Sequence, residues 1–188
     1  MALPVTFVAG DVLEAAQLNS NFTYLDGAGG VTLISATTIG SAVSTVTVSS
    51  AFSSTYDNYL ITISGGVAST SVDLSLQLGA TTTGYYTGYS KVTYSTGAAS
   101  GASNNNAANF SAVGVGTTDS LFAYVNVLGP NLAKYTNING GFGVTLTGST
   151  SSNFAGFLNN TTQYTAFTIA PSSGTLTGGT IRVYGYKN

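Results

Sequence analysis

The chain of 188 residues has 5% charged side chains and a net charge of −2, and it contains no histidine and no cysteine. An ordinary soluble domain carries about 25% charged residues. The missing types exclude an imidazole acid, base or metal ligand, a thiolate nucleophile, a disulfide and a thiolate-held metal. The six carboxylates are scattered singly, so the sequence predicts a protein that is not an enzyme and that holds no cofactor and no metal.

The first predicted element is a helix from about Asp11 to Leu25. Asp11 and Glu14 have the capping-box spacing, with Asp in place of Ser or Thr. A narrow apolar stripe follows at helical spacing and consists of Ala15, Leu18, Phe22 and Leu25. A helix of about 15 residues is marginal alone and needs a surface to pack on. That surface is either the chain's own domain or a neighbouring subunit, and the sequence leaves both open.

The glycine-rich stretch after this helix divides the chain into two parts. Residues 1–30 are predicted to form an N-terminal arm and helix for attachment or oligomerisation. Residues 31–188 are predicted to form a β-sandwich domain, which we call the β-domain. The apolar side chains expected to make the attachment are Phe7, Val8, Leu13, Leu18, Phe22 and Leu25.

After Gly30 the hydrophobic pattern changes to period two, which is typical of strands. Val72–Leu78 is the clearest case, because four apolar residues alternate with Asp73, Ser75 and Gln77. Similar runs are Val46–Val48, Tyr59–Ile63, Tyr85–Tyr94, Phe110–Val115, Leu121–Leu128, Asn137–Leu146, Phe154–Leu158, Tyr164–Ile169 and Thr180–Tyr186. Turn residues separate them roughly every 10 to 14 residues. The pattern predicts an all-β fold, an antiparallel β-sandwich of the jelly-roll kind with about nine to eleven strands.

Two kinds of segment between these runs are predicted to lie outside strands. Gly97–Ala108 has no large side chain and is predicted to be an exposed loop. The Gly-x-Gly sequences Gly114–Gly116 and Gly141–Gly143 lack the following helix that a phosphate site requires. They are predicted to be turns or bulges.

The tyrosine cluster around residue 85 is the best candidate for receptor contact, since a tyrosine offers both a flat apolar face and a hydroxyl. Its members are Tyr85, Tyr86 and Tyr89. Strand alternation places Tyr85 and Tyr89 on one face and Tyr86 on the other, so part of the cluster is expected in the core. No basic groove accompanies these rings, which argues against nucleic-acid stacking.

The surface composition indicates a protein that works inside an assembly. The four cations are far apart, so no basic patch for nucleic acid is predicted: they are Lys91, Lys134, Arg182 and Lys187. No stretch approaches the length of a membrane span, and none resembles a secretory signal. Because so little charge keeps copies apart, we expect a homo-oligomer.

Parts of the chain resemble virion proteins of tailed bacteriophages. Residues 7–22, FVAGDVLEAAQLNSNF, resemble short N-terminal segments of phage appendage and accessory proteins. Residues 49–66, 74–86, 129–136 and 162–188 resemble β-rich virion domains from phages of marine and cyanobacterial hosts, as a pattern of strands and turns. The resemblance carries no catalytic signature and no site residues.

The resemblance implies a structural protein of the virion, assembled in the host cytoplasm, commonly as a trimer. The first expectation is a tail fibre or appendage, with the arm bound to tail or baseplate proteins and the β-domain touching a host-surface glycan or protein. The alternatives are a capsid decoration (cement) protein that stabilises the shell and a lectin-like carbohydrate-binding module. A glycosidase would need Asp57, Asp73 or Asp119 to meet in the fold, and none lies in a recognisable motif.

Overall fold

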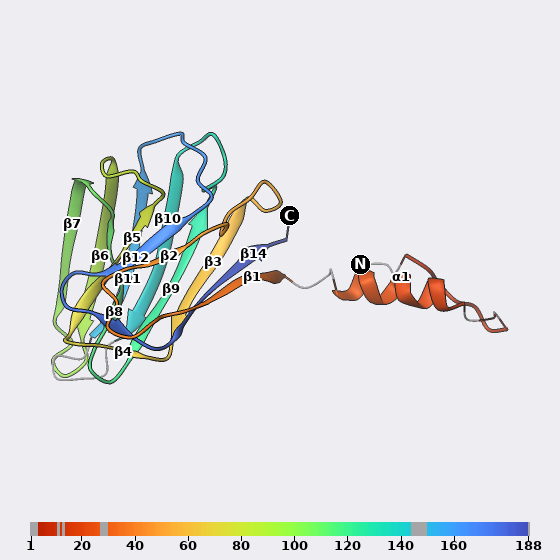
Figure 1. Cartoon of the computed structure of the whole chain (residues 1–188), viewed down its shortest axis with the longest axis horizontal. Helices are drawn as coiled ribbons and strands as arrows, with labels where there is room; N and C mark the ends of the chain where they lie inside the picture. Colours follow the sequence, from red (N-terminus) through yellow and green to blue (C-terminus); the bar gives the residue numbers. More distant parts are fainter. Residues whose placement is uncertain (1–3, 11, 13, 27–29, 144–149, 188) are drawn as a thin grey trace.

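The computed structural model describes residues 4–10, 12, 14–26, 30–143 and 150–187. These residues form one short helix near the N-terminus and fourteen strands, all paired antiparallel (Figure 1), so the predicted all-β, antiparallel character is confirmed. The elements are α1 (Ala15–Asp26), β1 (Val31–Thr38), β2 (Val46–Val48), β3 (Asn58–Ser64), β4 (Val67–Ala68), β5 (Val72–Leu78), β6 (Tyr85–Thr93), β7 (Ala99–Ala107), β8 (Phe110–Gly116), β9 (Leu121–Leu128), β10 (Thr136–Gly143), β11 (Thr150–Leu158), β12 (Phe167–Pro171), β13 (Leu176–Thr177) and β14 (Thr180–Tyr186).

Twelve of these strands form one branched, open sheet. Its path runs β2-β12-β5-β8-β9-β10-β11-β6-β7, and β9 also pairs with β3, which is followed by β14 and β1. β8 meets β9 only at the end of their hairpin, through Val115–Phe122 and Gly116–Leu121. The sheet therefore divides there into a four-strand branch (β2, β12, β5, β8) and an eight-strand branch (β1, β14, β3, β9, β10, β11, β6, β7). β4 and β13 pair separately.

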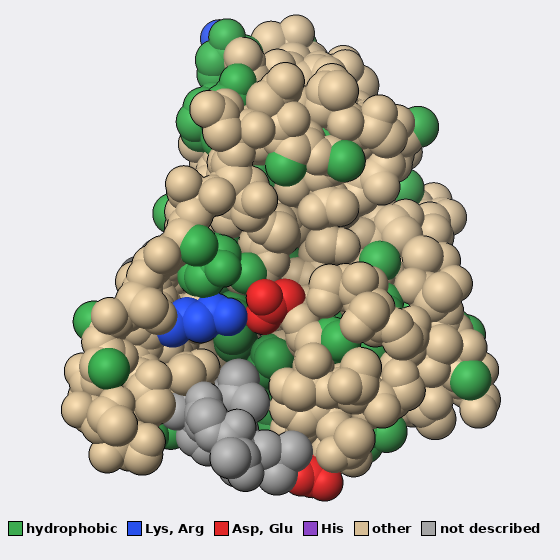
Figure 2. Space-filling model, turned by 90° about the vertical axis from the view of Figure 1, so that its left-hand side faces the viewer, with side chains coloured by type: hydrophobic (Ala, Val, Ile, Leu, Met, Phe, Trp, Pro, Cys, Tyr) green, Lys and Arg blue, Asp and Glu red, His purple; other side chains and the backbone are tan. Residues whose placement is uncertain are grey.

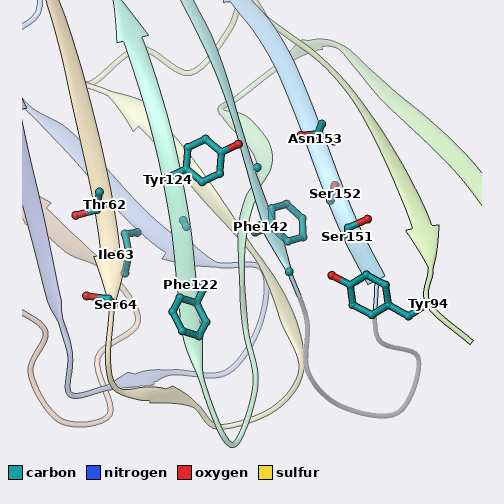
Figure 3. Close-up of a pocket in the computed structure, with 13 residues that line it drawn as sticks. Thr62, Ile63, Ser64, Tyr94, Phe122, Tyr124, Phe142, Ser151, Ser152 and Asn153 are labelled. Atoms are coloured by element: carbon teal, nitrogen blue, oxygen red, sulfur yellow. The ribbon is translucent and has the colours of Figure 1, made fainter. Parts of the chain in front are cut away.

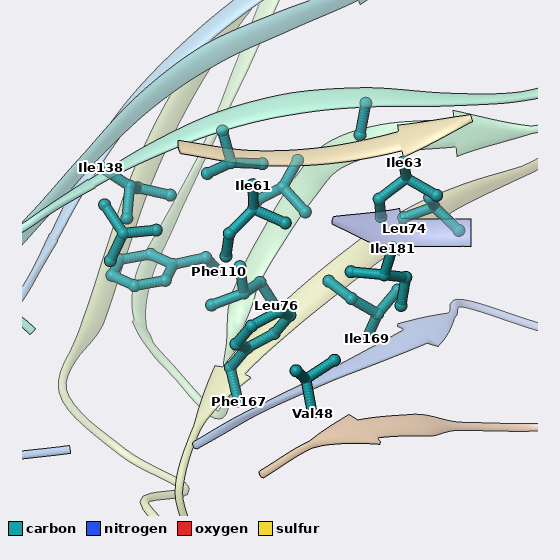
Figure 4. Close-up of a cluster of buried hydrophobic side chains, with 14 of the residues drawn as sticks. Val48, Ile61, Ile63, Leu74, Leu76, Phe110, Ile138, Phe167, Ile169 and Ile181 are labelled. Carbon is teal, nitrogen blue, oxygen red and sulfur yellow. The ribbon is translucent and has the colours of Figure 1, made fainter. Parts of the chain in front are cut away.

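Alternating side chains from both branches form a single hydrophobic cluster (Figure 4). β3 and β5 each bury every second residue, as period-two patterning requires. Ile61 and Ile63 of β3 meet Leu74 and Leu76 of β5 in this cluster, together with Ile169 of β12. Removal of such apolar surface from water is the main favourable contribution to folding, about 25 cal/mol per Å².

Alternation located most strands, including the edge strand β2, but missed the edge strands β1 and β7. β5, β9 and β14 have the predicted bounds. The prediction that Gly97–Ala108 is a loop is wrong, because Ala99–Ala107 forms β7, which pairs with β6. Most side chains of β7 are exposed, as expected for that segment. An edge strand is held by backbone hydrogen bonds, so it needs no large side chain.

Both Gly-x-Gly sequences lie inside strands, so neither is a turn. The register of β10 is regular through Gly143, so the predicted bulge is wrong there, whereas the pairing of β8 with β5 is irregular directly before Gly114. A Cβ on Gly114 of β8 would lie 2.5 Å from the Cβ of Ala123. A Cβ on Gly141 of β10 would lie 2.9 Å from the carbonyl oxygen of Ser152 on β11. At these positions glycine allows neighbouring strands and side chains to approach closely.

Buried tyrosine hydroxyls tie loops to the core. The Tyr59 hydroxyl accepts a hydrogen bond from the Ser53 amide at 2.8 Å and donates one to the Ser53 carbonyl at 2.7 Å. The Tyr85 hydroxyl accepts from the Leu78 amide at 2.9 Å and donates to the Thr81 carbonyl at 3.2 Å. Each hydroxyl thus satisfies polar groups that would otherwise be costly to bury.

Replacing Tyr85 with Phe is expected to weaken the dependence of stability on pH in the alkaline range. Burial raises the pKa of Tyr85 to about 12, above the ordinary value of about 10. The folded state therefore holds this proton more tightly, and the resulting stability is fully present below pH 10 and is lost as the pH rises towards 12. The loss approaches about 2 to 3 kcal/mol.

The measurement is denaturant unfolding at pH 9 and at pH 11.5. At pH 9 we expect Tyr85→Phe to cost about 1 to 3 kcal/mol, because the Leu78 amide loses its acceptor. Between the two pH values Tyr85→Phe should lose less stability than the parent chain does. Tyr86→Phe, at a partly exposed ring, is the control and should keep the parent's pH dependence. Equal pH dependence in the parent and in Tyr85→Phe would contradict the assignment.

The N-terminal arm and α1 lie beside the β-rich part and not on it (Figure 1), and no described strand packs extensively against α1. The arm instead folds along the helix through Asn21, whose buried amide accepts from the Val5 amide at 3.0 Å and donates to the Val5 carbonyl at 2.9 Å. Within the described residues, no helix has the length and hydrophobicity that a membrane span requires.

Candidate functional site

The outward-facing surface of the eight-strand branch carries several concave features. Strand register places Thr62 of β3, Tyr124 of β9, Gly141 of β10 and Asn153 of β11 next to one another in a row across four strands. The side chains between them along each strand point into the core, as the alternating burial of β3 and β9 shows. A hollow therefore forms on the outer face wherever the row carries small residues.

One hollow lies at the end of this face nearest the β8–β9 turn and has a volume of about 660 Å³ (Figure 3). We call it the aromatic groove. Phe122 and Tyr124 project from β9 on one side, and Tyr94, just after β6, reaches in from the other. Phe142 of β10 also lines the groove, but its side chain belongs to the core cluster. Tyr94, Phe122 and Tyr124 are 59%, 47% and 48% exposed, whereas Phe142 is buried. Ser151 and Asn153 of β11, with Gly141 and Gly143 of β10, complete the groove as we define it.

Glycines in β10 create the space beneath these rings. A Cβ on Gly141 would lie 3.0 Å from the Tyr124 hydroxyl and 3.2 Å from Asn153 Oδ1. A Cβ on Gly143 would lie 3.2 Å from the Tyr94 hydroxyl. The two tyrosine hydroxyls therefore lie close to β10 backbone that carries no side chain, and the groove keeps its depth because both positions are glycine.

The groove is neutral and polar at its rim. None of the described residues that line it carries a charge. Arg182 is the nearest cation on the β3 side, and its Nη1 donates to the hydroxyl of Ser64 at 3.3 Å. Lys91 lies on the other side, 5.9 Å from the centre of the Phe142 ring, and its Nζ is 3.4 Å from the Asp73 carboxylate. Lys91–Asp73 is the ion pair found among the described residues.

Neutral surface extends beyond the groove. Figure 2, which views the molecule from the β7 side, shows few charged side chains on a surface that is otherwise uncharged and has hydrophobic side chains scattered over it. Two shallower hollows continue along the same branch. One is lined by Gly88, Asn153 and Ala155, and the other by Tyr86 and Phe157, whose rings stack at 4.7 Å.

The predicted tyrosine cluster is divided between core and surface. The prediction of receptor contact is wrong for Tyr85, because its side chain is fully buried and packs edge-on against Phe110 at 4.8 Å. Tyr89 is partly buried against the core, with Lys91 5.0 Å above its ring. Tyr86 lies on the opposite, outward face. The predicted division into two faces is confirmed, and contact through Tyr86 or Tyr89 stays a prediction.

The residues predicted for attachment are mostly accessible. Val8, Leu18 and Phe22 are exposed, and Phe7 is half-buried. Leu13 and the side chain of Leu25 lie outside the described residues, as does Asp11 of the predicted capping box. Glu14 precedes the helix, and its carbonyl accepts hydrogen bonds from the amides of residues 17 and 18.

Sequence reasoning missed the aromatic groove, although part of its signal is visible in the sequence. In Leu121–Leu128, the residues Phe122 and Tyr124 occupy the face opposite Leu121, Ala123 and Val125. Large aromatic residues on the solvent face of an alternating strand are the informative exception to burial. Tyr94 carried no such signal, because it lies beyond the end of β6.

The described residues contain no cluster of three or more carboxylates that could hold a metal ion. Comparison of the chain with protein-family models, with curated proteins and with solved structures gave no match.

Proposed function

We propose that this chain is a non-enzymatic structural protein of a tailed-phage particle, most simply a tail fibre or appendage. Its N-terminal arm and helix attach it to another virion protein, and its β-domain contacts the host surface. In this proposal the two branches of the sheet form a β-sandwich of the jelly-roll kind, and three copies assemble. Figure 1 shows both parts, the N-terminal part with α1 and the β-rich part.

The observation that carries the proposal is the exposed apolar surface of the N-terminal part. Phe22 is 58% exposed and Val12 is 83% exposed, and no described strand packs extensively against α1. A helix of this length is marginal in water without a packing partner. The β-domain meanwhile has a complete hydrophobic cluster of its own. A segment of this kind fits attachment to another protein, and the neutral surface of the β-domain fits an assembled particle.

The second function that this observation favours is capsid decoration. The exposed apolar side chains of the N-terminal arm and α1 would bind neighbouring subunits of the capsid shell equally well. Immunogold labelling of purified particles with antibodies against the chain separates the two. Label confined to the tail supports the appendage, label over the shell replaces it with decoration, and particles without label overturn both.

Changing Phe22 to Ser in the full chain is expected to reduce co-sedimentation with particles by at least about tenfold, the scale of losing one buried aromatic anchor. Because Phe22 is exposed in the single chain, the melting temperature should stay within about 2 °C of the parent. Thr23→Ala, at the next exposed residue of α1, is the matched control and should attach normally. Full attachment of Phe22→Ser would show that this stripe is not the anchor.

A further inference from the structure

The shape of the aromatic groove suits a small ligand or one segment of a chain-like ligand. Its volume of about 660 Å³ lies in the range of about 300 to 1,000 Å³ that is usual for small-molecule sites. It is recessed between rings over a floor of glycine, which distinguishes it from the flatter patches through which folded proteins usually associate.

The chemistry of the walls combines flat apolar faces with hydroxyl and amide groups. Tyr94, Phe122 and Tyr124 leave about half of each side chain accessible. Ser151 and Asn153 add hydrogen-bonding groups at the rim, and their side chains form no hydrogen bond with any other described residue. A saccharide ring has the matching character, because it presents an apolar C–H face and a periphery of hydroxyls. Rings of tyrosine and phenylalanine can stack on the C–H face, and polar side chains beside them can form hydrogen bonds with the hydroxyls.

The charges around the groove decide which class of saccharide fits best. None of the described lining residues is charged. The Lys91 ammonium is paired with Asp73, and the Arg182 guanidinium lies outside the lining, bonded to Ser64. An acidic polysaccharide or a nucleic acid would need several cations along its path, whereas an uncharged glycan needs none.

We infer that the aromatic groove binds an uncharged saccharide of the host surface by stacking it on the exposed rings of Tyr124 and Tyr94. This inference rests on the proposed function, since it names the component that the β-domain contacts. Gly141 and Gly143 keep the floor open, and Asn153 orients the sugar through its amide.

The test begins with the full chain on an array of neutral and acidic glycans. We expect binding to neutral glycans, and a neutral oligosaccharide found in this way is then titrated by calorimetry. Tyr124→Ala and Tyr94→Ala should each weaken its binding by at least about tenfold. Tyr124→Phe keeps the ring and should bind within about threefold of the parent. Thermal melts check that each variant is folded. We expect little change in melting temperature, because these side chains are exposed.

Two matched controls make the result specific. Tyr135→Ala removes an exposed ring in the β9–β10 connection, outside the groove lining, and Arg182→Gln removes the nearest cation on the β3 side. Both should bind as the parent does. Absence of binding to every neutral glycan overturns the inference, as does loss of binding in Arg182→Gln with retention in Tyr124→Ala. A change of oligomeric state in the tyrosine variants without a change in glycan binding makes the groove a contact between copies, and likewise overturns it.

Failure of this inference is distinguishable from failure of the proposed function. If particles are labelled but no neutral glycan on the array binds, the saccharide inference is overturned and the virion role stands. Glycan binding by a chain that never labels particles overturns the virion role and leaves the groove assignment intact.

Discussion

Replacing Phe110 with Ala is expected to lower the free energy of unfolding by about 3 to 5 kcal/mol. Phe110 starts β8, is fully buried and packs edge-on against Tyr85. A Cβ on Gly156 of β11 would already lie 3.3 Å from its ring, so the ring fills space between β8 and the eight-strand branch. Truncation leaves a cavity that close-packed strands cannot fill, and the cost includes both lost burial and lost contacts.

The measurement is equilibrium unfolding in urea, with the slope of the transition compared between variants to check two-state behaviour. Phe157→Ala is the matched control, because Phe157 stacks on Tyr86 at the outer face and is 38% exposed. We expect it to cost about 0.5 to 1.5 kcal/mol. Equal losses at the two positions would show that Phe110 does not join the branches.

Replacing Gly140 with Ala is expected to destabilise the protein by about 3 kcal/mol, at the upper end of what overpacking usually costs. A Cβ at this position of β10 would lie 2.1 Å from the carbonyl oxygen of Tyr124 and 2.6 Å from the ring of Phe154. The first of these atoms belongs to the backbone of β9, which cannot move without disturbing its hydrogen bonds to β10. Relief of the clash therefore separates two central strands of the sheet.

Gly88→Ala is the control for this substitution. Gly88 lies in β6 with an exposed outer face, and a Cβ there would meet nothing within 4 Å. Alanine at such a position should be neutral or stabilise by about 0.5 kcal/mol, since glycine loses more backbone entropy on folding. Urea unfolding and hydrogen exchange of the β9 and β10 amides measure both variants. Normal stability of Gly140→Ala would mean that β9 and β10 are not packed as closely as described.

Strand positions were predictable where one face of a strand is apolar and the other polar. Val72–Leu78 and Thr180–Tyr186 show this alternation and form β5 and β14 with the expected bounds. The pattern works because each of these strands contributes alternate side chains to one core. Val31–Thr38 forms β1 at a sheet edge with most of its residues exposed, so burial left no clear period there to detect.

The candidate site was less predictable, because it depends on which strands become neighbours. Tyr94 and Tyr124 are 30 positions apart, and they line one groove because only β10 and β11 come between β9 and β6. Alternation gives the face of a residue but not the order of strands. The same limit explains Tyr85, where local clustering suggested a surface role and the pairing of β6 with β11 placed the ring against Phe110.

Hydrogen bonds from tyrosine hydroxyls hold several loops in place, and this bears on the solution conditions that the protein tolerates. The hydroxyls of Tyr59 in β3 and Tyr85 in β6 hydrogen-bond the backbone of loops, and the hydroxyl of Tyr164 lies 2.7 Å from that of Thr81. These contacts are hydrogen bonds, so they include no disulfide that a reductant cleaves and no ion pair that salt weakens. Burial raises the pKa of Tyr85, so its hydroxyl keeps its proton throughout mildly acidic and neutral water. The loops should therefore resist proteases over a wider span of environments than loops secured by cystines or by paired charges.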